Sequence, residues 1–269
     1  MVYRMAFPKA ALNGAFVFGL IFAPGPCLAQ VTKMSAACEV PSADIGNSQS
    51  LVRLTAKLQH GDNIRILAIG SSSTYGLGAT SRSKNYPSDL RGILSAALKN
   101  VKVEVVNRGV SGEVAATTAE RIRSEVAIDP PDLVLWQLGT NDALQRVPPD
   151  EFESTVINTL EWLKENHVDV ALIGMQYTAP LARDENYRAI RNVLQKVTSK
   201  YNILYVHRYK AMQYMANAHK NLKMLANDNF HLNDQGYECM AEHVARAVVA
   251  STFGKRFRPI ESEKSKLNE

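Results

Sequence analysis

Short apolar runs alternate with amphipathic stretches along most of the chain, and this alternation limits the folds that it can adopt. Strands are predicted by runs rich in β-branched residues at Ile64–Ile69, Val101–Val106, Leu133–Leu138, Val168–Met175 and Ile203–Val206. Helices are predicted at Ser48–His60, Pro87–Lys99, Glu113–Ala127, Pro149–Asn166, Asp184–Tyr201 and Asp234–Thr252. Strands that alternate with helices form parallel βαβ units. The pattern therefore predicts an α/β fold, a flavodoxin-like three-layer α/β/α sandwich with a central parallel sheet of about five strands.

The amino terminus has the three parts of a secretory signal peptide. Arg4 and Lys9 precede an apolar run over Ala10–Ala23, which is followed by Pro-Gly-Pro and small residues up to Ala29. We expect cleavage near Ala29 and a secreted or periplasmic protein. The run contains Asn13 and is shorter than the roughly 20 residues of a spanning helix, so no stable membrane insertion is expected after cleavage.

The rest of the chain is expected to form one domain. We divide the sequence into a signal peptide (1–29), an amino-terminal strap (30–60), a catalytic-size domain (61–254) and a charged tail (255–269). The net charge of +5 comes partly from the leader and the tail and forms no basic stripe, so no nucleic-acid partner is expected. No Cys or His spacing is typical of a metal site, and no metal or cofactor is expected. The sequence does not indicate an oligomeric state.

The cysteines are Cys27, Cys38 and Cys239, so cleavage of the leader would leave two. Two cysteines in an oxidising compartment favour a disulfide between Cys38 and Cys239, with two unrelated free thiols as the alternative. Helical spacing places Cys239 on a polar edge of the last predicted helix, with Glu242 and His243, where a peripheral strap could reach it.

Polar residues follow each of the first three predicted strands. Gly70-Ser71-Ser72-Ser73-Thr74-Tyr75-Gly76 follows the first, Asn107-Arg108-Gly109-Val110-Ser111-Gly112-Glu113 the second, and Leu138-Gly139-Thr140-Asn141-Asp142 the third. In parallel sheets the functional loops lie at the carboxyl ends of the strands. The serine turn could present a nucleophile, and the glycines and Asn141 could offer N–H groups to an oxyanion. Read singly, each segment is as well explained as an ordinary turn or helix cap.

A candidate base and a carboxylate lie just before the last predicted helix, in Asp228-Asn229-Phe230-His231. Together they could activate a serine in one of the loops described above. A serine hydroxyl is a weak nucleophile until a base takes its proton, and a carboxylate that orients the imidazole improves that base. Because Asp228 and His231 are three residues apart, they can meet on one turn. An unperturbed histidine titrates near pH 6.5, so activity is expected to rise from mildly acidic to neutral pH.

Taken together, these four segments resemble the SGNH (GDSL-type) hydrolase family over about Ile64 to Val249. The resemblance implies that Ser72 is the nucleophile, His231 the base and Asp228 the orienting carboxylate. It also implies an oxyanion hole formed by the N–H of Ser72, by Gly112 and by Asn141. One departure is Ser71, which stands where the family usually has aspartate and leaves the choice of serine open by one position.

A secreted serine esterase that hydrolyses short-chain or O-acetyl carboxylic esters is the function that this resemblance implies, with a small-molecule or polysaccharide ester as substrate. The alternatives are a lysophospholipase or arylesterase acting on lipid or aryl esters, an acyltransferase, and a non-catalytic phosphate- or ligand-binding module on the same fold. A binding module would use the serine turn but would leave Asn141, Asp228 and His231 without a task.

Overall fold

A computed structural model describes residues 34–47, 49–218 and 223–253. The predicted signal peptide (1–29), the start of the strap (30–33), Ser48 and the charged tail (255–269) lie outside these residues. Among the residues that are described, no helix is both long and apolar enough to cross a membrane.

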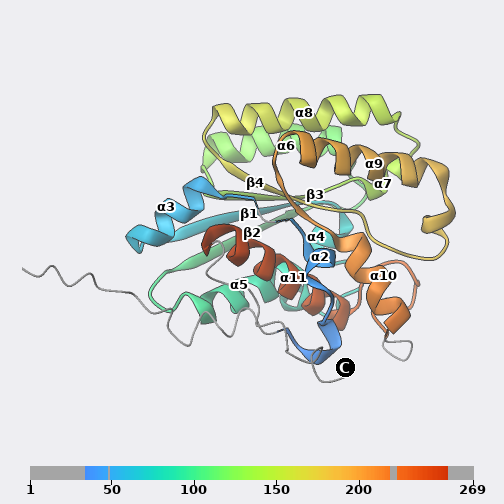
Figure 1. Ribbon diagram of the computed structural model, residues 1–269, viewed down its shortest axis with the longest axis horizontal. Helices are drawn as coiled ribbons and strands as arrows, with labels where there is room; N and C mark the ends of the chain where they lie inside the picture. Colours follow the sequence, from blue (N-terminus) through green and yellow to red (C-terminus); the bar gives the residue numbers. More distant parts are fainter. Residues whose placement is uncertain (1–33, 48, 219–222, 254–269) are drawn as a thin grey trace, which may run out of the picture.

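The centre of the fold is a parallel sheet of five strands in the order β2-β1-β3-β4-β5 (Figure 1). The strands are β1 (Ile64–Gly70), β2 (Val103–Gly109), β3 (Leu133–Gln137), β4 (Asp169–Ile173) and β5 (Leu204–Val206). This confirms the predicted flavodoxin-like sandwich. The strand order reverses between β1 and β3, and in such sheets the functional crevice opens beyond the carboxyl ends of those two strands.

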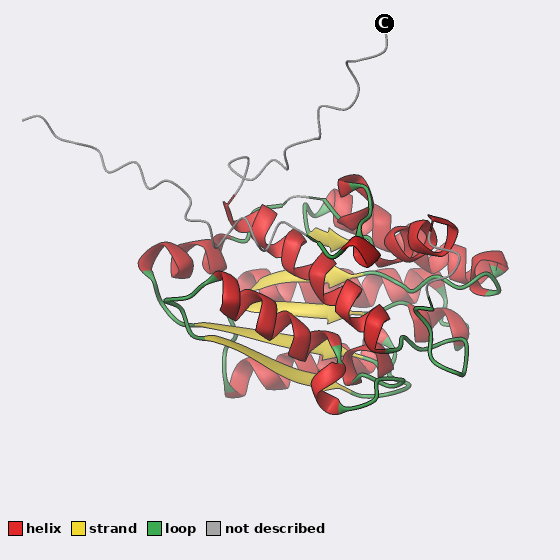
Figure 2. Ribbon diagram, turned by 90° about the horizontal axis from the view of Figure 1, so that it is seen from below, coloured by secondary structure: helices red, strands yellow, loops and turns green. Residues whose placement is uncertain are grey.

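Helices cover both faces of the sheet (Figures 1 and 2). They are α2 (Ser42–Ile45), α3 (Val52–His60), α4 (Ser72–Tyr75), α5 (Tyr86–Ala97), α6 (Ala115–Ile128), α7 (Thr140–Leu144), α8 (Pro149–Glu165), α9 (Glu185–Lys200), α10 (Arg208–Ala218) and α11 (Asp234–Phe253). Single 3₁₀ turns occur at η1 (Ala36–Cys38), η2 (Arg82–Lys84) and η3 (Leu181–Arg183). The long helices lie where the periodicity predicts them, whereas α2, α4, α7 and α10 were not predicted.

Side-chain caps explain where two of the long helices begin. The Asn85 side chain accepts a hydrogen bond from Ser88 N at the start of α5, and Pro87 occupies the first turn, where a missing N–H does no harm. Asp184 accepts one from Tyr187 N at the start of α9. Short polar side chains of this kind satisfy backbone N–H groups that have no partner within the helix.

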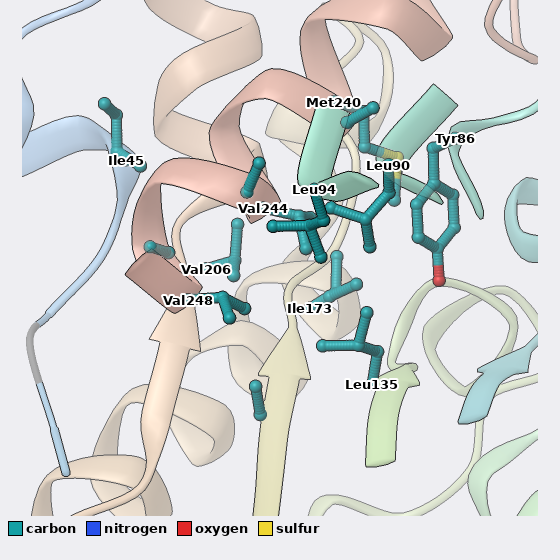
Figure 3. Packing of buried hydrophobic residues seen from close by; sticks show 14 of the residues in the cluster. Ile45, Tyr86, Leu90, Leu94, Leu135, Ile173, Val206, Met240, Val244 and Val248 are labelled. Carbon is teal, nitrogen blue, oxygen red and sulfur yellow. The ribbon is translucent and has the colours of Figure 1, made fainter. Parts of the chain in front are cut away.

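The hydrophobic core has two layers, because alternate residues of each strand face opposite sides of the sheet. Leu135, Ile173 and Val206 pack with residues of α5 and α11, as Figure 3 shows, and Ile66 belongs to the same cluster. The neighbouring strand residues, including Trp136, pack with α6, α8 and α9. Burying one large aliphatic side chain contributes about 1.5–3 kcal/mol, so both layers hold the sheet in place.

The described part of the strap belongs to the first of these layers. Ile45, Leu51 and Leu54 are buried in the cluster that contains α11. Gly46 forms an antiparallel bridge with Val206 of β5, and the Asn47 side chain accepts a hydrogen bond from Tyr205 N. The strap therefore covers the outer edge of β5, an edge that would otherwise offer unpaired backbone groups.

A disulfide joins Cys38 of the strap to Cys239 of α11, with Cα atoms 4.9 Å apart. This confirms the predicted disulfide. Cys239 and His243, which share the polar edge of α11 with Glu242, are both buried. The strap is the reason. It lies over this edge of α11, where His243 Nε2 contacts the Cys38 carbonyl oxygen at 2.7 Å and Glu242 accepts from Ser35 N.

Replacing both bridged cysteines with alanine is expected to lower the free energy of unfolding. The bridge closes a loop of 201 residues, for which the chain-entropy model gives a loss of up to about 5 kcal/mol. Denaturant unfolding of the double variant and the unmodified protein measures the difference. A parallel thiol count on the denatured, unreduced mature protein should find none at Cys38 and Cys239, and two free thiols there would contradict the bridge.

Candidate active site

The carboxyl ends of β1, β2 and β3 lie at one edge of the sheet, because the strands end in register. Gly70, the last residue of β1, pairs with Gly109 of β2 on one side and Gln137 of β3 on the other. The three loops singled out in the sequence start within a few residues of these positions. The register therefore brings the serine turn, the Gly112 loop and the Asn141 turn to the same edge of the sheet.

Two glycines allow the tight approach at the serine turn. Gly70 has a φ of +151°, and a Cβ there would lie 2.4 Å from the Gln137 carbonyl oxygen. A Cβ on Gly109 would lie 2.0 Å from Tyr75 N, in α4. Only glycine fits either position, and the close approach places the start of α4, at Ser72, directly beyond the sheet.

A continuous chain of hydrogen bonds runs from Ser72 to His231 and Asp228. His231 Nε2 lies 3.0 Å from Ser72 Oγ, and His231 Nδ1 lies 2.6 Å from Asp228 Oδ2. The other carboxylate oxygen of Asp228 accepts from the backbone N–H groups of Phe230 and His231, which holds the turn closed. Asn229, in the turn, has a φ of +54°, which asparagine tolerates better than most residues.

Among the three serines, only Ser72 has its hydroxyl against the imidazole. Ser71 Oγ donates to Gln137 Oε1 at 3.0 Å, and Ser73 Oγ accepts from Arg208 Nη2 at 3.1 Å. Ser72 is thus the one of these three serines whose hydroxyl lies within hydrogen-bond distance of His231.

Ser71, the departure from the usual aspartate, is matched by its neighbour Gln137. The Gln137 amide oxygen accepts from Ser71 N and Ser71 Oγ and lies 3.3 Å from Thr74 Oγ1. A carboxylate at position 71 would lie against this oxygen in a buried place, and the two groups would repel because both are hydrogen-bond acceptors. The serine hydroxyl supplies the donor that this arrangement needs.

The charge of Asp228 is held in place by the groups that bond to it. The hydrogen bond with His231 and the backbone N–H of Phe230 lower the pKa of Asp228 to about 2. Asp228 is therefore a carboxylate at near-neutral pH, and His231 Nδ1 lies against its negative charge. A fixed anion at Nδ1 favours the tautomer that carries its proton on Nδ1, so that Nε2 faces the Ser72 hydroxyl as an acceptor.

The two other residues with a predicted role in anion binding lie in linked loops. Asn141 Nδ2 donates to the Glu113 carbonyl oxygen at 2.8 Å, which uses one of its two N–H groups. Gly112 has a φ of +86°, and its carbonyl oxygen accepts from Gln145 Nε2 at 2.9 Å. These bonds tie the Gly112 loop to α7 and leave one N–H of Asn141 for another acceptor.

Asp142, which the sequence suggested only as part of a turn, is buried, and its carboxylate holds two loops of this region together by hydrogen bonds. Its carboxylate accepts from Ala115 N at 2.7 Å and from Gly139 N at 3.1 Å, and burial raises its pKa. It thus joins the start of α6 to the turn that carries Asn141.

Arg208 is a further residue at the site, and the sequence reasoning missed it. It lies two residues beyond β5 and is 3% exposed, and Nη2 donates to both Ser73 Oγ and Gln176 Oε1. Burial lowers the pKa of its guanidinium. Its place just after a strand was the available signal, but sequence alone does not show that its side chain reaches the serine turn.

No group of three or more potential metal-ligating side chains occurs among the described residues. Three of the predicted site residues are in contact with one another in the structure: Ser72, His231 and Asp228. The other two, Asn141 and Gly112, lie in loops that are joined by hydrogen bonds.

Comparison with known proteins gives a family and a fold. Residues 37–252 match the model of the Non-GDSL lipase-like family, and none of the curated proteins matches the chain.

Among solved structures, an acetyl xylan esterase from Geobacillus stearothermophilus is 23% identical with a TM-score of 0.59, covering 70% of this chain and 95% of that one. The esterase EstA from Pseudoalteromonas sp. is 15% identical with a TM-score of 0.58, covering 69% and 97%. A two-domain esterase active on acetylated mannans is 15% identical with a TM-score of 0.67, covering 84% of this chain and 60% of that one. At these identities the likeness shows a shared fold.

Proposed function

Because the chain belongs to the Non-GDSL lipase-like family and has the fold of SGNH-type hydrolases, we propose that it is a serine esterase that hydrolyses carboxylic ester bonds. The observation that carries this proposal is the hydrogen-bonded chain from Ser72 through His231 to Asp228. A non-catalytic binding module would have no use for an imidazole placed against one hydroxyl and oriented by a carboxylate. The name of the family also agrees with the Gly-Ser-Ser-Ser turn, which lacks the usual aspartate.

The first half of the reaction transfers the acyl group to Ser72. His231 Nε2 accepts the hydroxyl proton as Ser72 Oγ forms a bond to the ester carbonyl carbon, and Asp228 stabilises the imidazolium that results. The tetrahedral intermediate then breaks its bond to the alcohol oxygen, which takes the proton from His231 and leaves. In the second half, water gives a proton to His231 and attacks the acyl-serine, releasing the carboxylic acid and restoring the Ser72 hydroxyl.

Three N–H groups are proposed to stabilise the negative oxygen of the intermediate. They are the backbone N–H groups of Ser72 and Gly112 and the side-chain N–H of Asn141 that Glu113 does not occupy. The Ser72 N–H belongs to the first turn of α4, where backbone donors have no partner within the helix. Donors fixed before the reaction stabilise the developing charge without having to reorganise.

Replacing Asn141 with alanine is expected to lower kcat by 10²- to 10³-fold, the usual loss for one oxyanion donor, or about 3–4 kcal/mol. Gln145→Ala is the matched control, because Gln145 also donates to the Gly112 loop but has no proposed contact with the oxyanion. Steady-state hydrolysis of a soluble acetate ester measures both variants. Equal losses in the two would show that Asn141 only holds the loop.

We propose short-chain or O-acetyl esters as the substrates. The support is that esterases with this fold include one named for acetyl xylan and one active on acetylated mannans. A series of nitrophenyl esters from acetyl to dodecanoyl, followed by acetylated xylan and mannan, tests the proposal. We expect kcat/KM to be highest for acetyl, whereas a maximum at long chains would favour the alternative of a lipid esterase. No hydrolysis of any ester, with a folded protein, would contradict the esterase itself.

We also propose that the protein is exported and that its leader is cleaved near Ala29. The leader sequence supports this, and so does a buried disulfide, since such bonds persist in oxidising compartments. Intact-mass measurement of the protein from an exporting host should give a chain that begins near Gln30. A chain that retains Met1 in the exported fraction would contradict cleavage.

A further inference from the structure

A cavity of about 720 Å³ lies behind the loop that carries the catalytic pair. Its lining comes from the segment before α11 (residues 223–227, 229 and 232), from one side of α10, from α11 and from the segment after β4 at 177–180. Neither Ser72 nor His231 lines it. The cavity is therefore separate from the Ser72 crevice, although Asn227 and Asn229 of the catalytic loop form part of its wall, and its size is that of a pocket for a small organic molecule.

Methionines form much of the apolar lining of this cavity. Met212 and Met215 come from α10, Met240 from α11, and Met224 from the segment before the catalytic loop. Methionine side chains are unbranched and polarizable, so a surface made of them adapts to apolar ligands of different shape. The lining favours a ligand with an apolar chain or ring system.

The charges that line the cavity all have one sign. Arg208 and Lys223 line it, and no aspartate or glutamate does among the residues that the structure describes. His243 also lines it, but burial lowers the pKa of its imidazole, which favours the neutral form, and its Nε2 contacts the Cys38 carbonyl oxygen. Of these two cationic side chains, Lys223 is exposed and Arg208 is buried.

Arg208 is buried and lacks an anionic partner among the described residues. Its Nη2 donates to Ser73 Oγ and Gln176 Oε1, which are neutral, and its Nε and Nη1 have no hydrogen-bond partner in the part of the chain that the structure describes. A buried charge without a counter-charge costs several kcal/mol. An anion in the adjoining cavity would offset that cost, because charges attract strongly where water is excluded.

We propose that this cavity binds an amphipathic carboxylate, a medium-chain fatty acid or an apolar acid of similar size. The chain lies against the methionines, and the carboxylate lies in the positive field of Arg208 and Lys223. The site is distinct from the catalytic crevice, and its occupation does not depend on ester hydrolysis.

Calorimetric titration of the mature protein with decanoate, below its micelle-forming concentration, tests the proposal. We expect saturable binding of decanoate, at least tenfold weaker binding of the uncharged decanol, and none of acetate, which lacks the chain. Lys223→Glu should weaken decanoate binding at least tenfold. Lys210→Glu is the matched control, because Lys210 is an exposed lysine of α10 that does not line this cavity, and it should bind decanoate as the unmodified protein does. Equal binding of decanol and decanoate, or unchanged binding by Lys223→Glu, would overturn the proposal.

The NMR signals of the methionines that line the cavity show whether the ligand binds there. In protein labelled with ¹³C at its methionine methyl groups, decanoate should shift the signals of Met212, Met215, Met224 and Met240. Met175 is the internal control, because it is buried in the core layer on the other face of the sheet. Unshifted cavity methionines at saturation would contradict this site.

Decanoate binding to protein whose Ser72 has been blocked by an organophosphate tests this proposal independently of the esterase proposal. The blocked protein should bind decanoate as tightly as unmodified protein, and loss of binding would instead place the ligand in the catalytic crevice.

Discussion

Replacing Ser72 with alanine is expected to abolish ester hydrolysis while the protein stays folded. Loss of a nucleophile of this type lowers kcat by about a million-fold in a well-studied serine protease. The substitution removes one oxygen at a crevice, and the bonds that shape the turn come from Gln137 and the backbone of α4, which remain. Turnover of a soluble acetate ester measures the loss, and circular dichroism with a thermal melt verifies the fold.

The neighbouring serines provide the controls for this variant. Ser71→Ala removes a hydrogen bond to Gln137 but leaves the bond from Ser71 N, so we expect activity within about tenfold of the unmodified enzyme. Ser73→Ala removes a partner of Arg208 and should also leave the nucleophile in place. Near-normal activity of Ser72→Ala, with a large loss in either neighbour, would show that the wrong serine has been assigned.

Replacing Asp228 with asparagine is expected to lower kcat by about 10⁴-fold, as the same change does in the trypsin-type triad. The amide matches the carboxylate in shape but has no charge to stabilise the imidazolium. Its NH₂ group can also donate to His231 Nδ1, which would leave the proton on Nε2 and prevent that atom from accepting the Ser72 proton. The measurement is kcat for a soluble acetate ester at several pH values between 5 and 9.

Asp234→Asn is the matched control for Asp228→Asn. Asp234 is a nearby carboxylate whose oxygens accept from Thr80 N and Thr80 Oγ1, and it has no contact with His231 among those found for the described residues. We expect a change of less than tenfold. If Asp228→Asn stayed within tenfold of the unmodified enzyme at every pH, the orienting role of Asp228 would be wrong.

The sequence predicts the layers and the strand ends because both depend on local pattern. β-Branched runs and helical periodicity identify the strands and long helices. The least accurate strand boundary is that of β2, predicted over 101–106 and observed over Val103–Gly109. Its polar end was read as a loop, but Asn107 and Arg108 pair with Ala68 and Ile69 of β1. Pairing with a neighbouring strand, which no local pattern reveals, extends the strand through polar residues.

The missing helices have a similar explanation. α2, α4 and α7 are four or five residues long, which is too short for a helical period to be recognised. α10 begins directly after β5 and carries its apolar residues among polar ones, so its start merges with the strand end.

The role of Arg208 depends on strand order. The residue follows β5 and yet reaches Ser73, after β1, which requires knowledge of how the loops meet in space. The burial of Cys239 was not predicted for the same reason, because helical spacing does not show that the strap covers this edge of α11.

Covalent labelling of the nucleophile is the most direct test of the central claim, that His231 and Asp228 activate Ser72. The mature protein is treated with an organophosphate ester, and the modified residue is identified by peptide mapping and mass spectrometry. We expect one adduct per chain, on Ser72, formed together with the loss of activity and absent from the Ser72→Ala variant. An adduct on Ser71 or Ser73, or full inactivation without any adduct on Ser72, would contradict that claim.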